Sequence, residues 1–445
     1  MADHLAPALL EACVVVGASN DKLREVYQTY NNNGAPEHLL LEPVVLHVLS
    51  PPFVGRPQNE SDLVGSHGKR RRSFLRKKRE HQPSGASAPS QGGAAEARGG
   101  SEDVSVPTDI DLMALPQLCF PGGLQVTNEQ RDEQFHFLVF TDIFGNKTHG
   151  VVMQCYQPIL EGISCFHNEA GSSKFSKLFT AFSFCVISKY PYFTALRDCL
   201  SCLLIQLRTC RLSDMEDRVK DFAAKLSLVP IPPPGQLHLM FTLRPLTIVL
   251  PSRDDKDHPA VDLDLHLPFL CLRPQQILQV LSCLLQEQRV VLFSADWARL
   301  TLFAESLLVF LQPLSWQQPY VPVLARGMLD FLMAPTAFLM GCHLSHFEEV
   351  ASETDDLILI NIDGGSVSTS CSDTLDLPQI PPAAADYFTQ RCQSLQMNFD
   401  LHQCRHATCS DINEQRAQRR AWQHHLNHDI QRITLELIVN IFRLK

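Results

Sequence analysis

The sequence predicts an α/β protein with three parts: an N-terminal α+β lobe, a central α/β lobe with a mostly parallel sheet, and the start of an all-helical C-terminal part. Three observations carry this prediction. A hairpin pattern lies at 136–156, strands and helices alternate from 274 to 362, and a helical pattern closes the chain from 411. The 445 residues are 45% hydrophobic and 19% charged, which is typical of globular proteins, and they are too many for one compact core.

The N-terminal lobe is expected from residues 10–57 and 104–165, which an insertion separates. Ser19 is a candidate cap for the first helix, and the Asn-rich run before Gly34 stops that helix. Strands that follow one another through hairpins, beside a helix, form a small antiparallel unit. The expected elements are strands over 12–16 and 44–49, a helix over 21–30, and a hairpin of 136–141 and 150–156.

The insertion at 58–103 is predicted to be a disordered linker, because Gly, Ser, Ala, Pro and Gln dominate its second half. It carries a basic run in a chain whose net charge is −10. The run is interpreted as a solvated linker, as a contact for anionic lipid, or as a nuclear-import or nucleic-acid element, and the acidic balance of the chain disfavours nucleic acid. Ser73 follows three arginines and is a candidate phosphosite that would weaken a lipid contact. The eight basic residues are Lys69, Arg70, Arg71, Arg72, Arg76, Lys77, Lys78 and Arg79.

The central lobe is expected over residues 175–365. Every position of 290–293 is apolar, which predicts a strand covered on both faces, and Asp296 is a candidate cap for the helix that follows. Strands and helices that alternate at this spacing predict a mostly parallel sheet with helices on its faces. The expected strands are 182–187, 238–242, 247–250, 289–293, 320–324, 338–340 and 357–362, with helices over 192–207, 274–286, 296–311 and 327–333.

Residues 366–410 are expected to be a linker, and 411–445 the start of a helical part. Ile433 and Leu437 belong to an apolar face that needs a partner, and no such partner follows it in the chain. Because the chain stops inside this helical pattern, we expect a shortened form of a longer protein.

The sequence lacks the motifs that mark covalent catalysis: there is no P-loop, Gly-x-Ser-x-Gly elbow, kinase signature or His-Glu-x-x-His zinc site. We therefore predict no catalytic residue, no cofactor and no metal. Cys199 and Cys202 form a Cys-x-x-Cys inside an amphipathic helix, where packing is favoured over redox or metal chemistry. One group has zinc-ligand residue types at a spacing that matches no standard finger: His402, Cys404, His406 and Cys409.

The cysteines and the chain start indicate a cytoplasmic protein. An odd number of cysteines, 15, is scattered mostly through apolar segments, which suits reduced thiols better than a disulfide framework. Asp3 stands where a secretory signal has basic residues, and no uncharged apolar run approaches the roughly 20 residues of a membrane span.

Several segments resemble the DENN domain family and keep its order along the chain. The most specific match is Leu284-Leu285-x-Glu287-x-Arg289-Val290-Val291-Leu292-Phe293-Ser294. Similarity to the first part of the domain lies in the upstream segments 10–17, 115–123 and 137–142. Similarity to the central part lies in segments 184–193, 311–316, 320–324, 334–341 and 357–363. The sequence departs from the family pattern at Ala325 and Ala337, where prolines are usual, and these changes affect packing at turns.

The resemblance implies a guanine nucleotide exchange factor for Rab GTPases, with a longin-like first lobe and an α/β second lobe. It implies a GDP-bound Rab of subfamily twelve as the substrate, and peripheral association with endosomal or vesicle membranes. Only the first helix of the family's all-helical downstream part, near 429–445, is expected here. A non-catalytic trafficking adaptor, or an inactive shortened form, is therefore the alternative.

No motif shows which residues contact the GTPase. Loops at the carboxyl ends of parallel strands commonly carry function, so we expect the contact at Asp363, Gly364 and Gly365. Asp363 is expected to meet a basic group or to compete for the magnesium environment. The alternative is an ordinary turn at the end of a strand.

Overall fold

The structure is a computed structural model. It describes residues 8–33, 39–50, 113–142, 144–160, 175–211, 214–233, 235, 238–252, 262–370, 377–399 and 411–443. The basic run with Ser73 and the group from His402 to Cys409 lie outside the described residues.

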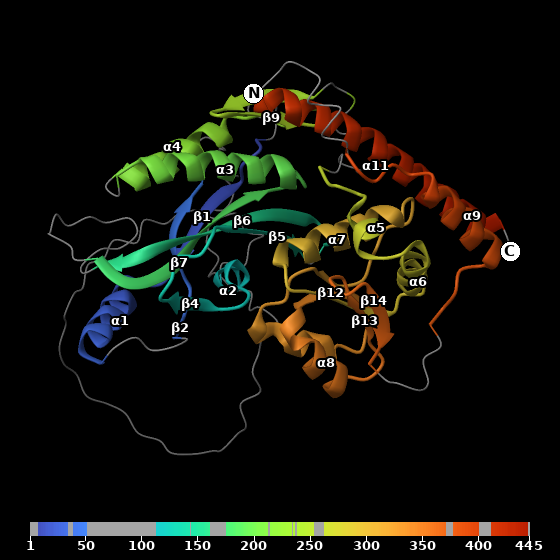
Figure 1. Ribbon diagram of the computed structural model, residues 1–445, viewed down its shortest axis with the longest axis horizontal. Coiled ribbons are helices and arrows are strands. Elements are labelled where there is room, and N and C mark those ends of the chain that lie inside the picture. Colours follow the sequence, from blue (N-terminus) through green and yellow to red (C-terminus); the bar gives the residue numbers. More distant parts are fainter. Residues whose placement is uncertain are drawn as a thin grey trace, which may run out of the picture. The chain divides into compact units, whose positions relative to one another are not determined.

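The first lobe is built on an antiparallel sheet of seven strands (Figure 1). Strand β7 lies inside it, paired with β1 on one side and with β6 on the other, and β5 extends the sheet by pairing with β6. The order β2-β4-β7-β1-β3 forms the main path of the sheet. The elements are β1 (Ala12–Gly17), α1 (Asn20–Asn33), β2 (Leu40–Leu41), β3 (Val44–Leu49), α2 (Leu115–Cys119), β4 (Leu124–Thr127), β5 (Gln134–Thr141), β6 (Lys147–Leu160) and β7 (Phe175–Ser188).

Strand β7 differs from its expected place as the first strand of the central lobe. Its residues from Ser183 to Ile187 pair residue by residue with β1, and the strand also runs antiparallel along β6 for most of its length. Every residue from Thr180 to Ser188 is buried, so both faces of the strand are covered, and an apolar run such as Phe184–Ile187 cannot by itself show which sheet a strand joins.

The chain then covers this sheet with α3 (Phe193–Thr209) and α4 (Met215–Ser227), and adds a separate hairpin of β8 (Leu239–Leu243) and β9 (Leu246–Leu250). Helix α3 packs on β6 and β9. Cys199 and Cys202 are both buried in it, which confirms that they pack as small apolar residues.

The second lobe holds a five-stranded sheet in the order β11-β12-β10-β13-β14, which confirms a mostly parallel sheet. Only β14 runs antiparallel to its neighbour. A Cβ on Gly341 would lie 2.0 Å from the carbonyl oxygen of Pro322, so this strand position accepts only glycine. The elements are α5 (Leu267–Cys271), α6 (Pro274–Leu285), β10 (Arg289–Ser294), α7 (Trp297–Phe310), β11 (Tyr320–Val321), η3 (Arg326–Met333, a 3₁₀ helix), β12 (Phe338–His343), η4 (Leu344–His346), α8 (Phe347–Glu353), β13 (Ile358–Asn361) and β14 (Ser366–Thr369).

Helix α7 joins the two lobes. It packs on β10 and β12 of its own lobe and along β5 of the first lobe. At mid-helix the hydroxyl of Thr301 donates a hydrogen bond of 2.6 Å to the carbonyl of Phe137, and both groups are buried. The helix is therefore apolar nearly all round, as a helix between two sheets must be.

The segment expected as a linker contains regular structure. Strand β14 and helix α9 (Pro382–Gln393) lie within 366–410, and α9 buries Ala384, Phe388 and Cys392 at intervals of four residues. Both elements lie within the span expected to be a linker, and the polar sequence of β14 gave no sign of a strand.

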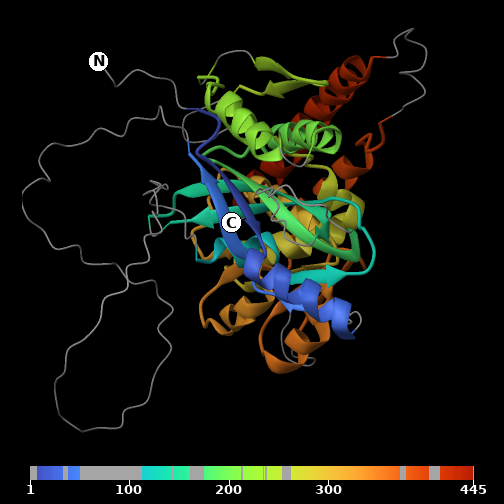
Figure 2. The same ribbon diagram turned by 90° about the vertical axis from the view of Figure 1, so that its left-hand side faces the viewer.

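The long helix α11 (Ile412–Arg443) closes the fold, and it begins earlier than the expected helix near 429. Its apolar face does find a partner, upstream in the chain: α9 and α7 cover Ile430, Ile433 and Leu437. Farther along the helix, Val439 and Phe442 stay exposed, by 39% and 56%. Figure 2 shows α11, in red, beside the α3 and β8–β9 region.

Two polar contacts hold the start of α11. Arg416 forms an ion pair with the buried Asp198 of α3, and the side-chain oxygen of Asn413 accepts a 2.9 Å bond from the backbone of Thr247 in β9. Within the described residues, no helix is long and apolar enough to cross a bilayer.

Candidate functional site

Asp363 lies at the carboxyl edge of the parallel sheet, where β10, β12 and β13 end together. Its carboxylate accepts hydrogen bonds from the Ser294 hydroxyl (2.9 Å) and from the backbone of Ala295 (2.6 Å), and it forms an ion pair with Arg299. Burial by itself raises the pKa of Asp363, but the bonds from Ala295, Ser294 and Arg299 outweigh burial and hold that pKa below its usual range. Within the chain, Asp363 is thus already paired with Arg299, and a contact of Asp363 with a basic group or the magnesium environment of the GTPase stays a prediction.

The two glycines after Asp363 form an anchored turn. The backbone of Gly364 donates a 2.8 Å bond to the side chain of Asn361, and the carbonyl of Gly365 accepts one of 2.6 Å from Gln276. Gly365 has a φ of +61°, and a Cβ there would lie 2.9 Å from the carbonyl oxygen of Cys271. A GTPase contact at these residues stays a prediction.

The Asp363 carboxylate fixes the loop that carries Trp297. This loop joins β10 to α7, where Asp296 caps the helix by accepting a 2.9 Å bond from the backbone of Ala298. The Trp297 ring packs on the ring of His343 at the end of β12, with centroids 5.0 Å apart. Burial lowers the pKa of His343, so this imidazole is neutral near pH 7.

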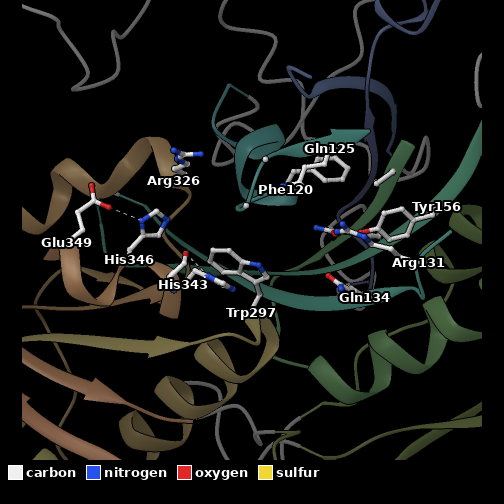
Figure 3. Close-up of a pocket in the computed structure, with 15 residues that line it drawn as sticks. Phe120, Gln125, Arg131, Gln134, Tyr156, Trp297, Arg326, His343, His346 and Glu349 are labelled. Atoms are coloured by element: carbon white, nitrogen blue, oxygen red, sulfur yellow. Dashed lines mark hydrogen bonds and ion pairs between the residues drawn. The ribbon is translucent and has the colours of Figure 1, made fainter. Parts of the chain in front are cut away.

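A cavity of about 630 Å³ opens beside Trp297 and is lined by both lobes (Figure 3). The first lobe contributes Arg131 and the second Arg326, whose backbone donates a 3.1 Å bond to Pro121. His346 and Glu349 contact each other at 3.1 Å on one wall. The remaining lining residues are Phe120, Gly122, Gly123, Gln125, Gln134, Gln154, Tyr156, Ala181, His343 and Ser345.

The arrangement suits recognition of a surface. Two exposed arginines and a half-buried tryptophan offer charge-assisted bonds and an aromatic anchor, which are the groups enriched at protein interfaces. Among the described residues, no cluster of three or more His, Cys, Asp or Glu could hold a metal ion.

The carboxyl edge of the sheet follows from the sequence, but the cavity does not. Arg131 and Trp297 are distant in the sequence and meet only because α7 packs along β5. A tryptophan directly after a helix-capping Asp, at the end of a buried strand, was the one local signal for this site.

Comparison with known proteins identifies the family. The DENN (AEX-3) domain model matches residues 179–365, and the uDENN domain model matches 103–155. This chain belongs to the DENN domain family. The resemblance of the sequence motifs is thereby confirmed, and the two lobes with their helical end fit a DENN domain architecture.

Relatives cover the chain to different extents. Mouse DENN domain-containing protein 3 is 49% identical over 99% of this chain and 35% of its own length. Human DENN domain-containing protein 1A is 29% identical over 60% of the chain and 24% of its own length. The Arabidopsis thaliana DENN domain and WD repeat-containing protein SCD1 is 27% identical over 44% of the chain and 16% of its own length. The chain therefore spans about a third, or less, of the length of these relatives.

Proposed function

We propose that this chain is a guanine nucleotide exchange factor that promotes GDP release from a Rab GTPase. The observation that carries the proposal is membership of the DENN family, whose members are in general Rab exchange factors. As the more specific substrate we propose a Rab of subfamily twelve, which the sequence resemblance implies. An exchange factor breaks no covalent bond, so its site has to supply a surface complementary to the GTPase.

The mechanism follows from linkage. An exchange protein that binds the nucleotide-free GTPase more tightly than the nucleotide-bound GTPase must lower the affinity of the GTPase for nucleotide by the same ratio. Faster release also requires that the factor stabilise the transition between the two states, through opening of a switch loop and loss of magnesium. Rigid surfaces suit this task, since they hold the opened loop in one arrangement.

The GTPase is proposed to lie across the carboxyl edge of the second lobe's sheet and the cavity that both lobes line. Trp297 supplies the aromatic anchor, and Arg131 and Arg326 meet carboxylates of the partner. The turn at Asp363, Gly364 and Gly365 flanks this surface. Because the Asp363 carboxylate is already bonded within the chain, its role is to position Trp297, and the turn contacts the GTPase through backbone groups.

The first test is release of a fluorescent GDP analogue from a panel of purified Rab proteins. We expect the chain to accelerate release from at least one Rab, and Trp297→Ala to lower the catalytic efficiency about tenfold. Trp297→Phe keeps an aromatic ring and is expected to retain most of the activity, while urea unfolding shows whether each variant is folded. Failure of the wild-type chain to accelerate any Rab would contradict the proposal.

The alternative, a non-catalytic adaptor or an inactive shortened form, predicts a different result in the same assay. A longer chain is the comparison that tests it, because this chain spans 35% of the mouse relative. A chain that binds nucleotide-free Rab without accelerating release, while a longer chain accelerates it, is an adaptor or an inactive form.

We also propose that the basic run from Lys69 to Arg79 contacts anionic lipid, with Ser73 as a phosphosite that weakens the contact. Each basic residue near an acidic leaflet contributes about 1 kcal/mol, so eight together suffice for peripheral binding. Sedimentation with phosphatidylserine vesicles tests this, and unchanged binding after neutralising all eight residues contradicts it.

A further inference from the structure

The turn between β5 and β6 presents an aromatic ring to solvent. Phe144 is 80% exposed, more than Phe331 (38%) or Phe442 (56%), so covering its ring would remove more apolar surface from water than covering either of those. A Cβ on the neighbouring Gly145, whose φ is +85°, would meet no atom within 4 Å, so the tip of the turn is open. The free chain gains nothing from this placement of the ring.

The backbone around Phe144 is held by one aspartate. The carboxylate of Asp142 accepts three hydrogen bonds of 2.8 Å, from the backbones of Phe144 and Asn146 and from the Asn146 side chain. Two backbone bonds, from Asp142 to Asn146 and from Gly145 to Asp142, close the turn. Because the backbone at Phe144 is held before binding, less conformational freedom is lost than if this backbone had to be ordered as well, and this raises the affinity of the contact.

The charges of the turn are directed inward. The Asp142 carboxylate is occupied by the turn itself, and the ammonium of Lys147 lies 4.8 Å from the ring centre of Tyr320 in the second lobe. The tip therefore presents an apolar ring with no free basic group beside it. An anionic membrane attracts basic clusters, so the tip fits an apolar spot on a protein better than a lipid surface.

The turn and the cavity lie at the two ends of one strand. Strand β5 begins at Gln134, which lines the cavity, and ends at Thr141, just before the turn. Eight residues of a strand span about 25 Å. A globular domain of about 150 residues is roughly 40 Å across, so a single GTPase is large enough to reach both ends of β5.

We propose that Phe144 is a second anchor for the GTPase and inserts into an apolar spot on its surface, at the far end of β5 from Trp297. This inference rests on the proposed function and adds a contact that neither the family match nor the cavity assigns. The Asp142 turn is the positioning device, and Phe144 makes the contact.

The test compares Phe144→Ala with the wild-type chain in GDP release and in binding to nucleotide-free Rab. We expect a loss of tenfold or more in both, as for truncation of a central interface aromatic, with unfolding free energy unchanged because the ring contacts solvent. Phe144→Leu should retain most of the activity. Leu228→Ala is the matched control, since Leu228 is 73% exposed at the end of α4, and it should leave both measurements unchanged.

The outcomes separate the two proposals. A wild-type chain that neither releases GDP from nor binds any Rab overturns the proposed function and this inference together. An active wild-type chain with an equally active Phe144→Ala variant overturns only the inference. A variant that keeps its activity on soluble Rab but loses binding to phosphatidylserine vesicles assigns Phe144 to the membrane and also overturns it.

Discussion

Replacing Asp363 by alanine removes the group that ties the end of β13 to the start of α7. The bond from the Ala295 backbone to the carboxylate is charge-assisted and contributes about 1.5–3 kcal/mol, and the bond from the Ser294 hydroxyl about 1 kcal/mol. The ion pair with Arg299 adds about 0.5 kcal/mol, because the arginine side chain is 38% exposed. Since water partly replaces these bonds in the variant, we expect a loss of about 3 kcal/mol in the free energy of unfolding.

Urea unfolding of the wild type and the variant measures this loss. Asp363 has a lowered pKa, so its contribution is present above the unfolded pKa of about 3.9 and disappears as the pH falls through the folded value. The difference between the two proteins should be constant from pH 7 to about pH 4.5 and shrink only in stronger acid. Asp330→Ala removes an exposed carboxylate and is the control, with a change expected within about 0.5 kcal/mol.

A difference below about 1 kcal/mol at pH 7 would refute this reasoning, because water would then satisfy the loop as well as the carboxylate does. GDP release adds a second measurement. If Asp363 only positions Trp297, the variant should lose activity on the GTPase in proportion to the loss shown by Trp297→Ala. An Asp363→Ala variant that keeps the wild-type free energy of unfolding but loses GDP-release activity would instead indicate that Asp363 contacts the GTPase directly.

Two further perturbations are predicted. Burial lowers the pKa of His136 to about 4, so this residue takes up a proton more readily in the unfolded chain than in the folded one. As the pH falls from 6.5 to 4, the free energy of unfolding should therefore drop by up to about 3 kcal/mol because of this residue. In His136→Gln, a plot of unfolding free energy against pH should be flatter over this range unless the site admits water. Arg416→Ala leaves the buried carboxylate of Asp198 without its ion pair and should destabilise the chain by about 2–3 kcal/mol. We expect this loss to appear as faster proteolysis within α11. An unchanged cleavage rate would mean that solvent replaces the ion pair.

The parts of the fold that were predictable are those with a strong local period. The continuous apolar run of β10 indicated a strand covered on both faces, and the capping role of Asp296 followed from its place before an apolar helix. The carboxyl edge of the sheet was predictable for the same reason, because the ends of parallel strands meet.

What could not be predicted depends on tertiary contact. The strand β14, Ser366–Thr369, has a polar sequence and is stabilised by its pairing with β13, so its own residues carry no signal. The cavity beside Trp297 needs Arg131 from the other lobe, and no local pattern connects the two. Phe144 was visible only as part of a turn, because exposure is a property of the folded chain.

The helix α11 has a consequence for the surface that the two lobes present. With 32 residues it is about 48 Å long, and it contacts α3 and β9 of the first region of the fold as well as α9 and α7 of the second. Together with α7, which packs on both sheets, it links the two lobes at a second place. None of the described residues that line the cavity beside Trp297 belongs to α11, so a mutation in this helix reaches that cavity only through the packing of the lobes.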